Sequence, residues 1–161
     1  MGEKRVVVHL AAQRLELWEG DALQATYAVS TSAKGAGEAQ DSEQTPRGLH
    51  EVCEKIGADR PPRAVFVGRE PTGEICTPDL AAAEPERDWI LTRILWLQGL
   101  EEGRNRGPGV DSKERFIYIH GTPEEHRLGE AASHGCIRMG NAEVAELFDR
   151  VEVGTRVEIV E

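Results

Sequence analysis

Short Val- and Leu-rich runs that end at turn residues fill the first third of this sequence, and they limit its fold more than any other feature. Residues 5–10 and 13–18 form two such runs, and residues 22–30 follow a Glu-Gly-Asp turn with apolar and polar residues in alternation. Alternation with a period of two is typical of β-strands that bury one face. The same signals predict further strands at residues 49–56, 64–68, 89–97, 116–119 and 155–160.

One helix is predicted near the end of the sequence. Val144, Leu147, Phe148 and Val151 recur at the i, i+3, i+4 and i+7 positions of one helix face, and Asn141 stands where it can cap the first turn. With the strands, this helix predicts a mainly β domain of the α+β class, mostly antiparallel, with one or two short helices.

Two stretches rich in proline and glycine are expected to be loops. Residues 70–88 contain three prolines and are predicted to be mostly loop. Residues 99–112 contain four glycines and one proline and predict a long Gly-rich loop, which could act as a lid. The run at residues 89–97 between them is compatible with a buried helix as well, but its close Gly and Pro flanks favour a strand. With 161 residues and no repeat or linker, we expect a single domain over residues 1–161.

The charge balance argues against some partners. Lys and Arg total 19 and Asp and Glu total 29, so the net charge is −10, which disfavours electrostatic binding to nucleic acid or anionic lipid. No stretch approaches the ~18 uninterrupted apolar residues of a membrane span. The first residues lack the apolar segment and cleavage site of a signal peptide. We therefore expect no membrane insertion and a cytoplasmic protein, or a periplasmic or cell-wall protein if an export signal has been removed.

The three cysteines, Cys53, Cys76 and Cys136, cannot all pair within one chain. Cys53 and Cys76 each lie in a short apolar stretch and are expected to be spectator thiols. Cys136 is different, because Gly135 precedes it and histidines stand nearby. An inert buried thiol is the alternative for Cys136, and its neighbours argue against that alternative.

A nucleophilic cysteine is the chemistry that the stretch at residues 119–139 predicts. A thiolate is the reactive form of cysteine, and a histidine or converging N–H groups favour it near neutral pH. His120 ends a predicted strand and is a better general base than His134, which lies too near Cys136 in sequence to fold back onto it. Gly135 permits an unusual backbone angle, so the N–H groups of residues 134–136 could converge on an oxyanion.

Zinc binding is the competing interpretation, but no zinc-ligand spacing supports it. No Cys-x-x-Cys, His-x-x-x-His or His-Glu-x-x-His motif occurs, so we expect neither a metal nor another cofactor. His9 and His50 alternate within predicted strands and are expected to be structural. The residues that zinc could recruit are His120, His126, His134 and Cys136.

These motifs resemble the catalytic domain of L,D-transpeptidases of the YkuD type. The family signature is a His-Gly-Thr segment followed by Ser/Thr-His-Gly-Cys and, shortly after, an Arg or Asn. This sequence has His120-Gly121-Thr122 and Ser133-His134-Gly135-Cys136-Ile137-Arg138 at the family's spacing, and Thr45-Pro46-Arg47-Gly48 resembles the family's Thr-Pro-x-Gly turn. The resemblance extends over nearly the whole chain and implies a β-sandwich or barrel-like catalytic domain.

The resemblance also implies roles for individual residues. Cys136 would be the nucleophile, and His120 would be its base, oriented through the backbone carbonyl of Gly121. The backbone N–H groups around His134, Gly135 and Cys136 would form the oxyanion hole. The residue that would shape this loop is Ser133.

The substrate implied by the resemblance is a peptidoglycan tetrapeptide stem. Cys136 would form a thioester at the L-centre of the third residue and release D-Ala. Transfer to an amine would give a 3–3 crosslink or D-amino acid exchange, and transfer to water would make the protein an L,D-carboxypeptidase of murein recycling, favoured if the missing export signal is native. Carbapenem β-lactams would be covalent inhibitors. A non-catalytic muropeptide-binding module on the same fold is the alternative, but it needs neither Cys136 nor His120.

Four further residues are candidates for binding the substrate. Arg138 lies two residues after the nucleophile and could anchor a carboxylate. Tyr118, Arg93 and Trp96 could line the cleft, although a Trp in an apolar strand is more often a core residue. Residues 57–114 are longer than a minimal catalytic domain needs, and a roofed pocket would favour small soluble stems over polymer.

Overall fold

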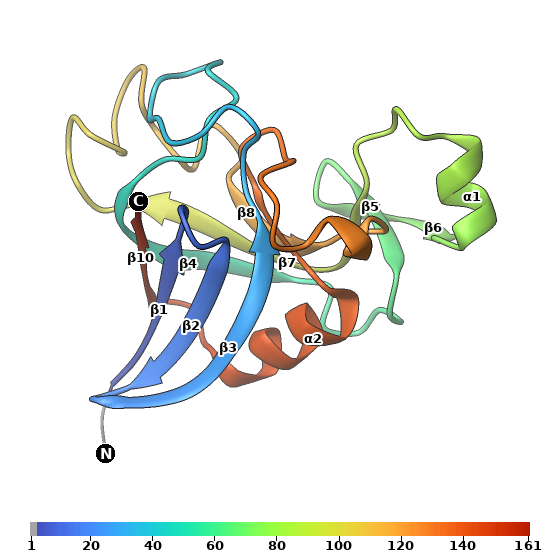
Figure 1. Cartoon of the computed structure of the whole chain (residues 1–161), viewed down its shortest axis with the longest axis horizontal. Helices are drawn as coiled ribbons and strands as arrows, with labels where there is room; N and C mark the ends of the chain where they lie inside the picture. The colour runs from blue at the N-terminus through green and yellow to red at the C-terminus, as the bar shows by residue number, and fades with distance from the viewer. Residues whose placement is uncertain (1–2) are drawn as a thin grey trace.

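Ten strands form one continuous sheet in the computed structural model, which describes residues 3–161 (Figure 1). Two helices and a short 3-10 turn complete it. The strands are β1 (Lys4–His9), β2 (Arg14–Glu19), β3 (Ala22–Ser30), β4 (Gly48–Ile56), β5 (Ala64–Val67), β6 (Glu70–Ile75), β7 (Ile90–Gly99), β8 (Tyr118–Gly121), β9 (Ile137–Met139) and β10 (Arg156–Val160). The helical elements are α1 (Pro78–Ala83), η1 (Glu125–Arg127) and α2 (Asn141–Arg150).

The sheet closes on itself into a barrel-like structure. Its order is β4-β10-β1-β2-β3-β9-β8-β7-β5-β6, and β4 also pairs with β7, so that β5 and β6 lie outside the closed part. Neighbouring strands are antiparallel except for the pairs β1–β10 and β8–β9. The mainly β, mostly antiparallel fold with two helices is the one that the sequence predicts.

The main core fills the barrel and extends beneath α2. Val144, Leu147 and Phe148 of α2 are buried, as their spacing predicts, and α2 packs against β7 and β8. Asn141 does not cap this helix, which corrects the prediction. Gly140 occupies the cap position and makes no side-chain cap bond, while the Asn141 side chain points inward and bonds to other segments. None of the helices in residues 3–161 has both the length and the apolar character to cross a membrane.

Residues 70–88 are not mostly loop, as their prolines suggest, but contain β6 and α1. Pro71 is tolerated because β6 is the last strand of the sheet and pairs only with β5. Pro78 stands at the start of α1, where its missing N–H costs no hydrogen bond, and Thr77 caps that helix. This segment extends away from the barrel, at the right of Figure 1.

Residues 99–112 lie outside the strands, as predicted, except for Gly99 at the end of β7. The Asn105 side chain donates to the carbonyls of Arg47 and Leu49 at 3.0 and 3.2 Å. This anchors the loop beside the start of β4. None of its residues lines the pocket around Cys136, so in this structure the loop does not cover that pocket.

Candidate active site

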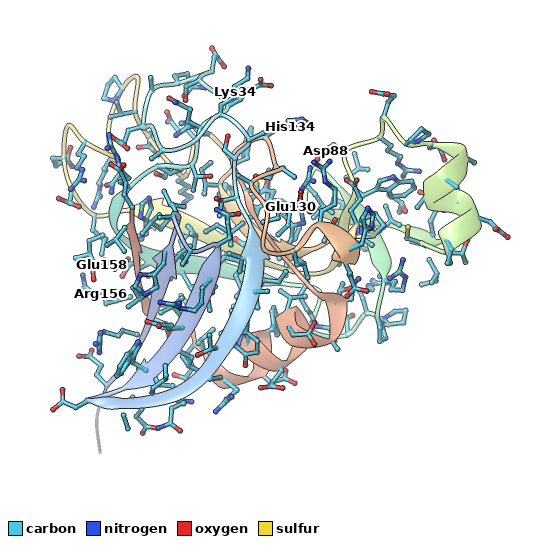
Figure 2. The ribbon with its side chains drawn as sticks, in the orientation of Figure 1. Lys34, Asp88, Glu130, His134, Arg156 and Glu158 are labelled. Atoms are coloured by element: carbon cyan, nitrogen blue, oxygen red, sulfur yellow. The ribbon has the colours of Figure 1, made fainter. Side chains whose placement is uncertain are left out.

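Cys136 opens into a hollow of about 440 Å³ where β8, β9 and the β5–β6 turn meet. Strand β8 contributes Tyr118 and His120, and the loop before β9 contributes Ser133 and His134. Figure 2 shows His134 and Asp88 on the same side of the molecule, far from Arg156 and Glu158 on β10. The lining residues are Gly68, Arg69, Asp88, Ile90, Arg115, Phe116, Tyr118, His120, Ser133, His134, Cys136 and Arg138.

Hydrogen bonds fix the loop that carries the cysteine. Ser133 Oγ donates to the Cys136 carbonyl at 2.6 Å and accepts from the Gly135 N–H at 3.2 Å. Gly135 has φ +130°, a left-handed conformation that favours glycine. The expectation that three N–H groups converge on an oxyanion is therefore corrected for Gly135, whose N–H is bound to Ser133. The N–H groups of His134 and Cys136 are the remaining candidates.

Buried Thr45 sets the direction of the peptide before Cys136. Thr45 Oγ1 donates to the Gly135 carbonyl at 2.9 Å and accepts from the Ser32 N–H at 3.0 Å. Carbonyl and N–H point to opposite sides of a trans peptide. A Gly135 carbonyl held by Thr45 thus turns the Cys136 N–H away from Thr45. Sequence reasoning noticed Thr45 only as part of a turn motif and did not predict this contact.

The His120 ring is buried and held in one tautomer. Its Nδ1 lies 2.7 Å from the carbonyl oxygen of Gly121. A carbonyl only accepts, so Nδ1 carries the proton, and in the neutral ring Nε2 is unprotonated and can act as a base. Gly121 is closely packed, because a Cβ atom there would lie 2.4 Å from Asn141 Oδ1. The structure thus contains the contact between His120 and the Gly121 carbonyl that the resemblance implied, and the role of His120 as a base stays a prediction.

A buried polar network supports the segment that follows His120. Thr92 Oγ1 donates to Asn141 Oδ1 at 2.6 Å, and Asn141 Nδ2 donates to the Thr122 carbonyl at 2.8 Å. Thr92 has φ +74°, a strained conformation for a β-branched residue, at an irregularity in the β7–β8 pairing. Sequence reasoning missed this network. In the sequence, Thr92 and Arg93 interrupt the apolar run of β7, and this interruption was the one sign of a polar contact there.

Two backbone groups contact the Cys136 thiol. Its Sγ donates to the Phe116 carbonyl at 3.3 Å and accepts from the Tyr118 N–H at 3.4 Å. Burial raises the pKa of Cys136 and lowers the pKa of His120, so thiol and neutral imidazole are the favoured pair. No hydrogen bond in residues 3–161 joins Sγ to His120. The sequence predicts a thiolate near neutral pH, whereas the direction of the Cys136 pKa favours the thiol.

Two of the four predicted substrate-binding residues lie in the pocket. Tyr118 and Arg138 line it, and Arg138 pairs with Glu124 at 3.5 Å. Trp96 does not line it, which corrects that prediction. Trp96 is the cross-strand neighbour of Tyr118 and packs edge-on against the Tyr118 ring, with ring centroids 5.9 Å apart.

Arg93 also lies away from the pocket, which corrects the prediction for this residue. Its guanidinium donates to the carbonyl of Arg60 at 2.9 Å and stands 5.6 Å from the centre of the Phe148 ring. Phe148 belongs to α2, so Arg93 serves the packing around that helix.

The pocket contains charged residues that sequence reasoning missed. Arg69 and Arg115 lie far from Cys136 in sequence, and with Arg138 they give the pocket three arginines against the single carboxylate of Asp88. In a chain of net charge −10 this is a local excess of positive charge. No short motif marks these residues, because the fold alone brings them to the site.

The other cysteines and histidines lie elsewhere. Cys53 and Cys76 do not line the pocket, and burial raises the pKa of both thiols. His9 bonds to Glu16 at 2.8 Å, and His50 is buried against Ser112. Among residues 3–161, no group of three or more His, Cys, Asp or Glu side chains is arranged to hold a metal ion.

A cysteine and a buried histidine that line one pocket are typical of cysteine acyltransferases. The family model of the YkuD L,D-transpeptidase catalytic domain matches residues 3–159. The chain belongs to this family.

Individual relatives agree with the family model. YqjB of Bacillus subtilis (strain 168), a protein named as an L,D-transpeptidase, is 48% identical over 56 residues, which cover 33% of this chain and 32% of YqjB. L,D-transpeptidase 3 from Mycobacterium tuberculosis, solved in complex with a faropenem-derived adduct, matches with a TM-score of 0.61 and 16% identity, over 99% of this chain and 61% of that chain.

The LD transpeptidase LdtMt1 in complex with imipenem matches with a TM-score of 0.59 and 19% identity, over 99% of this chain and 59% of that chain. At these identities, the solved structures show a shared fold. The present chain thus corresponds to about three fifths of each solved chain, and its match covers about a third of YqjB.

Proposed function

We propose that this protein is a cysteine acyltransferase that acts on peptidoglycan tetrapeptide stems. Cys136 attacks the carbonyl at the L-centre of the third residue, a thioester forms, and D-Ala leaves. The observation that carries the proposal is that Cys136 and His120 line the same pocket, and that His120 Nδ1 is bound to the Gly121 carbonyl so that Nε2 is available as a base. Family membership supports the reaction class.

His120 carries out the proton transfers, and Cys136 forms and then releases the bond to the carbonyl carbon. His120 Nε2 takes the proton of the thiol as Sγ bonds to the carbonyl carbon, and the carbonyl oxygen becomes an oxyanion beside the N–H groups of Cys136 and His134. The C–N bond to D-Ala then breaks, and His120 returns the proton to the leaving amine. In the second half, His120 removes a proton from the acceptor that attacks the thioester, and Sγ regains it.

The acceptor defines two versions of the activity. Transfer to an amine, as the family name implies, gives a 3–3 crosslink or an exchange with a D-amino acid. Transfer to water gives an L,D-carboxypeptidase of murein recycling. The β5–β6 turn supports the second version, because Gly68 and Arg69 line the pocket and a pocket walled by a turn would favour small soluble stems over polymer.

Product analysis tests the reaction and the acceptor together. A tetrapeptide stem is incubated with the protein, with and without glycine or a D-amino acid, and products are followed by mass spectrometry against Cys136→Ala as the blank. Tripeptide without an added acceptor indicates a carboxypeptidase, and exchange products or dimers indicate a transpeptidase. If wild type and Cys136→Ala give the same products, the nucleophile assignment is wrong.

Covalent inhibition gives an independent check on Cys136. Solved relatives are in complex with imipenem and a faropenem-derived adduct, and we expect a carbapenem to acylate Cys136 here. Intact-mass measurement should show one adduct on the wild type and none on Cys136→Ala. Stoichiometric muropeptide binding in a calorimeter, without turnover and unaffected by Cys136→Ala, would instead favour the non-catalytic binding module.

A further inference from the structure

The tip of the β5–β6 hairpin holds an arginine in an unusual backbone conformation. Val67 pairs with Glu70, so Gly68 and Arg69 form a two-residue turn, with φ angles of +57° and +67°. Two-residue turns with both central φ angles positive favour Gly, Asn and Asp, and an arginine in this region is uncommon. Strained residues of this kind cluster at ligand-binding sites.

Aromatic rings hold the Arg69 guanidinium at the wall of the pocket. Its central carbon lies 4.5 Å from the centre of the Trp96 ring and 5.1 Å from that of the Phe116 ring. Arg69 Nη1 donates to the Tyr118 hydroxyl at 3.0 Å. Stacking uses the flat faces of a guanidinium and leaves its in-plane N–H groups, which match a carboxylate in a two-pronged geometry, available for a ligand.

Arg69 differs from the other two arginines of the pocket in its partners. Arg138 pairs with Glu124, and the Arg115 guanidinium is bound to the Gln44 carbonyl at 2.6 Å. Within the part of the chain that the structure describes, no carboxylate lies within ion-pair distance of Arg69. Its single hydrogen bond there is the one to Tyr118, although a guanidinium has five N–H donors.

We propose that Arg69 is a specificity-determining residue that binds a carboxylate of the donor stem, an inference that rests on the proposed function. Two carboxylates of a tetrapeptide stem share this chemistry. One is the terminal carboxylate of D-Ala, and the other is the side-chain carboxylate of a diaminopimelate at the third position. One belongs to the third residue, whose carbonyl Cys136 attacks, and the other belongs to the D-Ala that follows it.

Substrates that lack one carboxylate at a time test the proposal. Release of the fourth residue is measured with the free stem, a stem with a C-terminal amide, and a stem amidated at the diaminopimelate side chain. The second stem releases D-alaninamide, and the other two release D-Ala. The enzymes are wild type, Arg69→Met and Arg69→Lys, with Arg156→Met as the control. Arg156 is an exposed arginine on β10, far from His134 in Figure 2.

We expect one of the two amidated stems to react about 10- to 100-fold less efficiently than the free stem with wild type, mostly through KM, because a hydrogen-bonded ion pair is lost. Arg69→Met should show the same loss with the free stem and no further loss with that amidated stem. Arg69→Lys should recover part of the loss, and Arg156→Met should match wild type. The amidated stem against which Arg69→Met no longer discriminates identifies the carboxylate that Arg69 binds.

The proposal is overturned if Arg69→Met discriminates against both amidated stems as strongly as wild type does, or if Arg156→Met causes the same loss. Melting temperatures of the variants separate a binding defect from a folding defect, and Arg69→Lys retains the charge if Arg69→Met is unstable. Failure of the proposed function looks different, because wild type would then release neither D-Ala nor D-alaninamide from any of the three stems.

Discussion

The closed barrel and the segment at residues 57–89, called here the extension, build the pocket in different ways. The barrel buries one large apolar cluster, and its strand β8 carries His120 while the loop leading into its strand β9 carries Cys136. The extension contains β5, β6 and α1. No residue of α1 is buried, and the extension reaches the pocket with Gly68, Arg69 and Asp88.

This difference indicates a division of labour. Reacting atoms must be held within a fraction of an ångström, which favours the hydrogen-bonded strands and packed core of the barrel. Contacts that select a substrate tolerate more variation and are commonly placed on turns at the edge of a rigid scaffold. We therefore expect changes in the barrel to affect turnover or global stability, and changes in the extension to affect substrate selection or local stability.

Replacing His120 should have the largest effect. His120→Ala is expected to lower the rate of D-Ala release about 10²- to 10⁴-fold at saturating stem, because the thiol loses its general base. Melting temperature and stem binding are measured alongside. His126→Ala is the matched control, since His126 lies in η1 and does not line the pocket. A large rise in KM with unchanged turnover would place His120 in recognition and contradict the division.

Much of the barrel was predictable from sequence because its strands bury one face. In β2, Leu15 and Leu17 are buried between less buried neighbours, and this alternation is visible in the residues alone. Helix α2 was predictable for the same reason, since Leu147 and Phe148 lie on its one buried face. In both cases, the spacing of apolar residues along the sequence shows which face of the element packs against the large core.

The extension and the shell of the site were less predictable because nothing periodic marks them. Strand β6 has no buried residue, so Pro71 and the prolines that follow the strand outweighed every other signal. Cys136 and His120 were found through a local motif. Arg69 and the Thr92–Asn141 pair reach the site through tertiary pairing, which no single stretch of sequence encodes.

A matched pair of leucine truncations should expose the difference in packing. Leu95, in β7, is fully buried in the barrel core, and Leu80, in α1, is only partly buried against a small cluster. We expect Leu95→Ala to lower the free energy of unfolding by about 2–5 kcal/mol, and Leu80→Ala by less than about 1 kcal/mol. Urea denaturation measures both. Equal losses would show that the extension is part of the main cooperative unit.

Acid should weaken the barrel through its buried histidines. His50 bonds to Ser112 at 2.8 Å, and burial lowers the pKa of His50 to about 4. The unfolded chain binds a proton at this residue near pH 6.5, so stability is fully present above that pH and is lost as pH falls toward 4. We expect a loss on the order of 2 kcal/mol between pH 7 and pH 4.5.

The variant His50→Gln isolates this contribution. Its free energy of unfolding should fall less steeply between pH 7 and pH 4.5 than that of wild type, although it starts from a lower value. Residues 57–89 contain no histidine, so the contribution of histidines to the acid sensitivity is expected to come from the barrel. A variant that retains the full pH dependence of the wild type would show that other groups cause it.

The smallest expected effect is the loss of the cap of α1. Thr77 Oγ1 accepts the Leu80 N–H at 3.1 Å, and Thr77→Ala should cost about 1 kcal/mol of helix stability. Because α1 has no buried residue, this cost should appear as faster hydrogen exchange of the α1 amides, with unchanged global unfolding and D-Ala release. Thr77→Ser keeps the hydroxyl and should exchange like the wild type. A drop in the global melting temperature of several degrees would couple α1 to the barrel and weaken the division between the two regions.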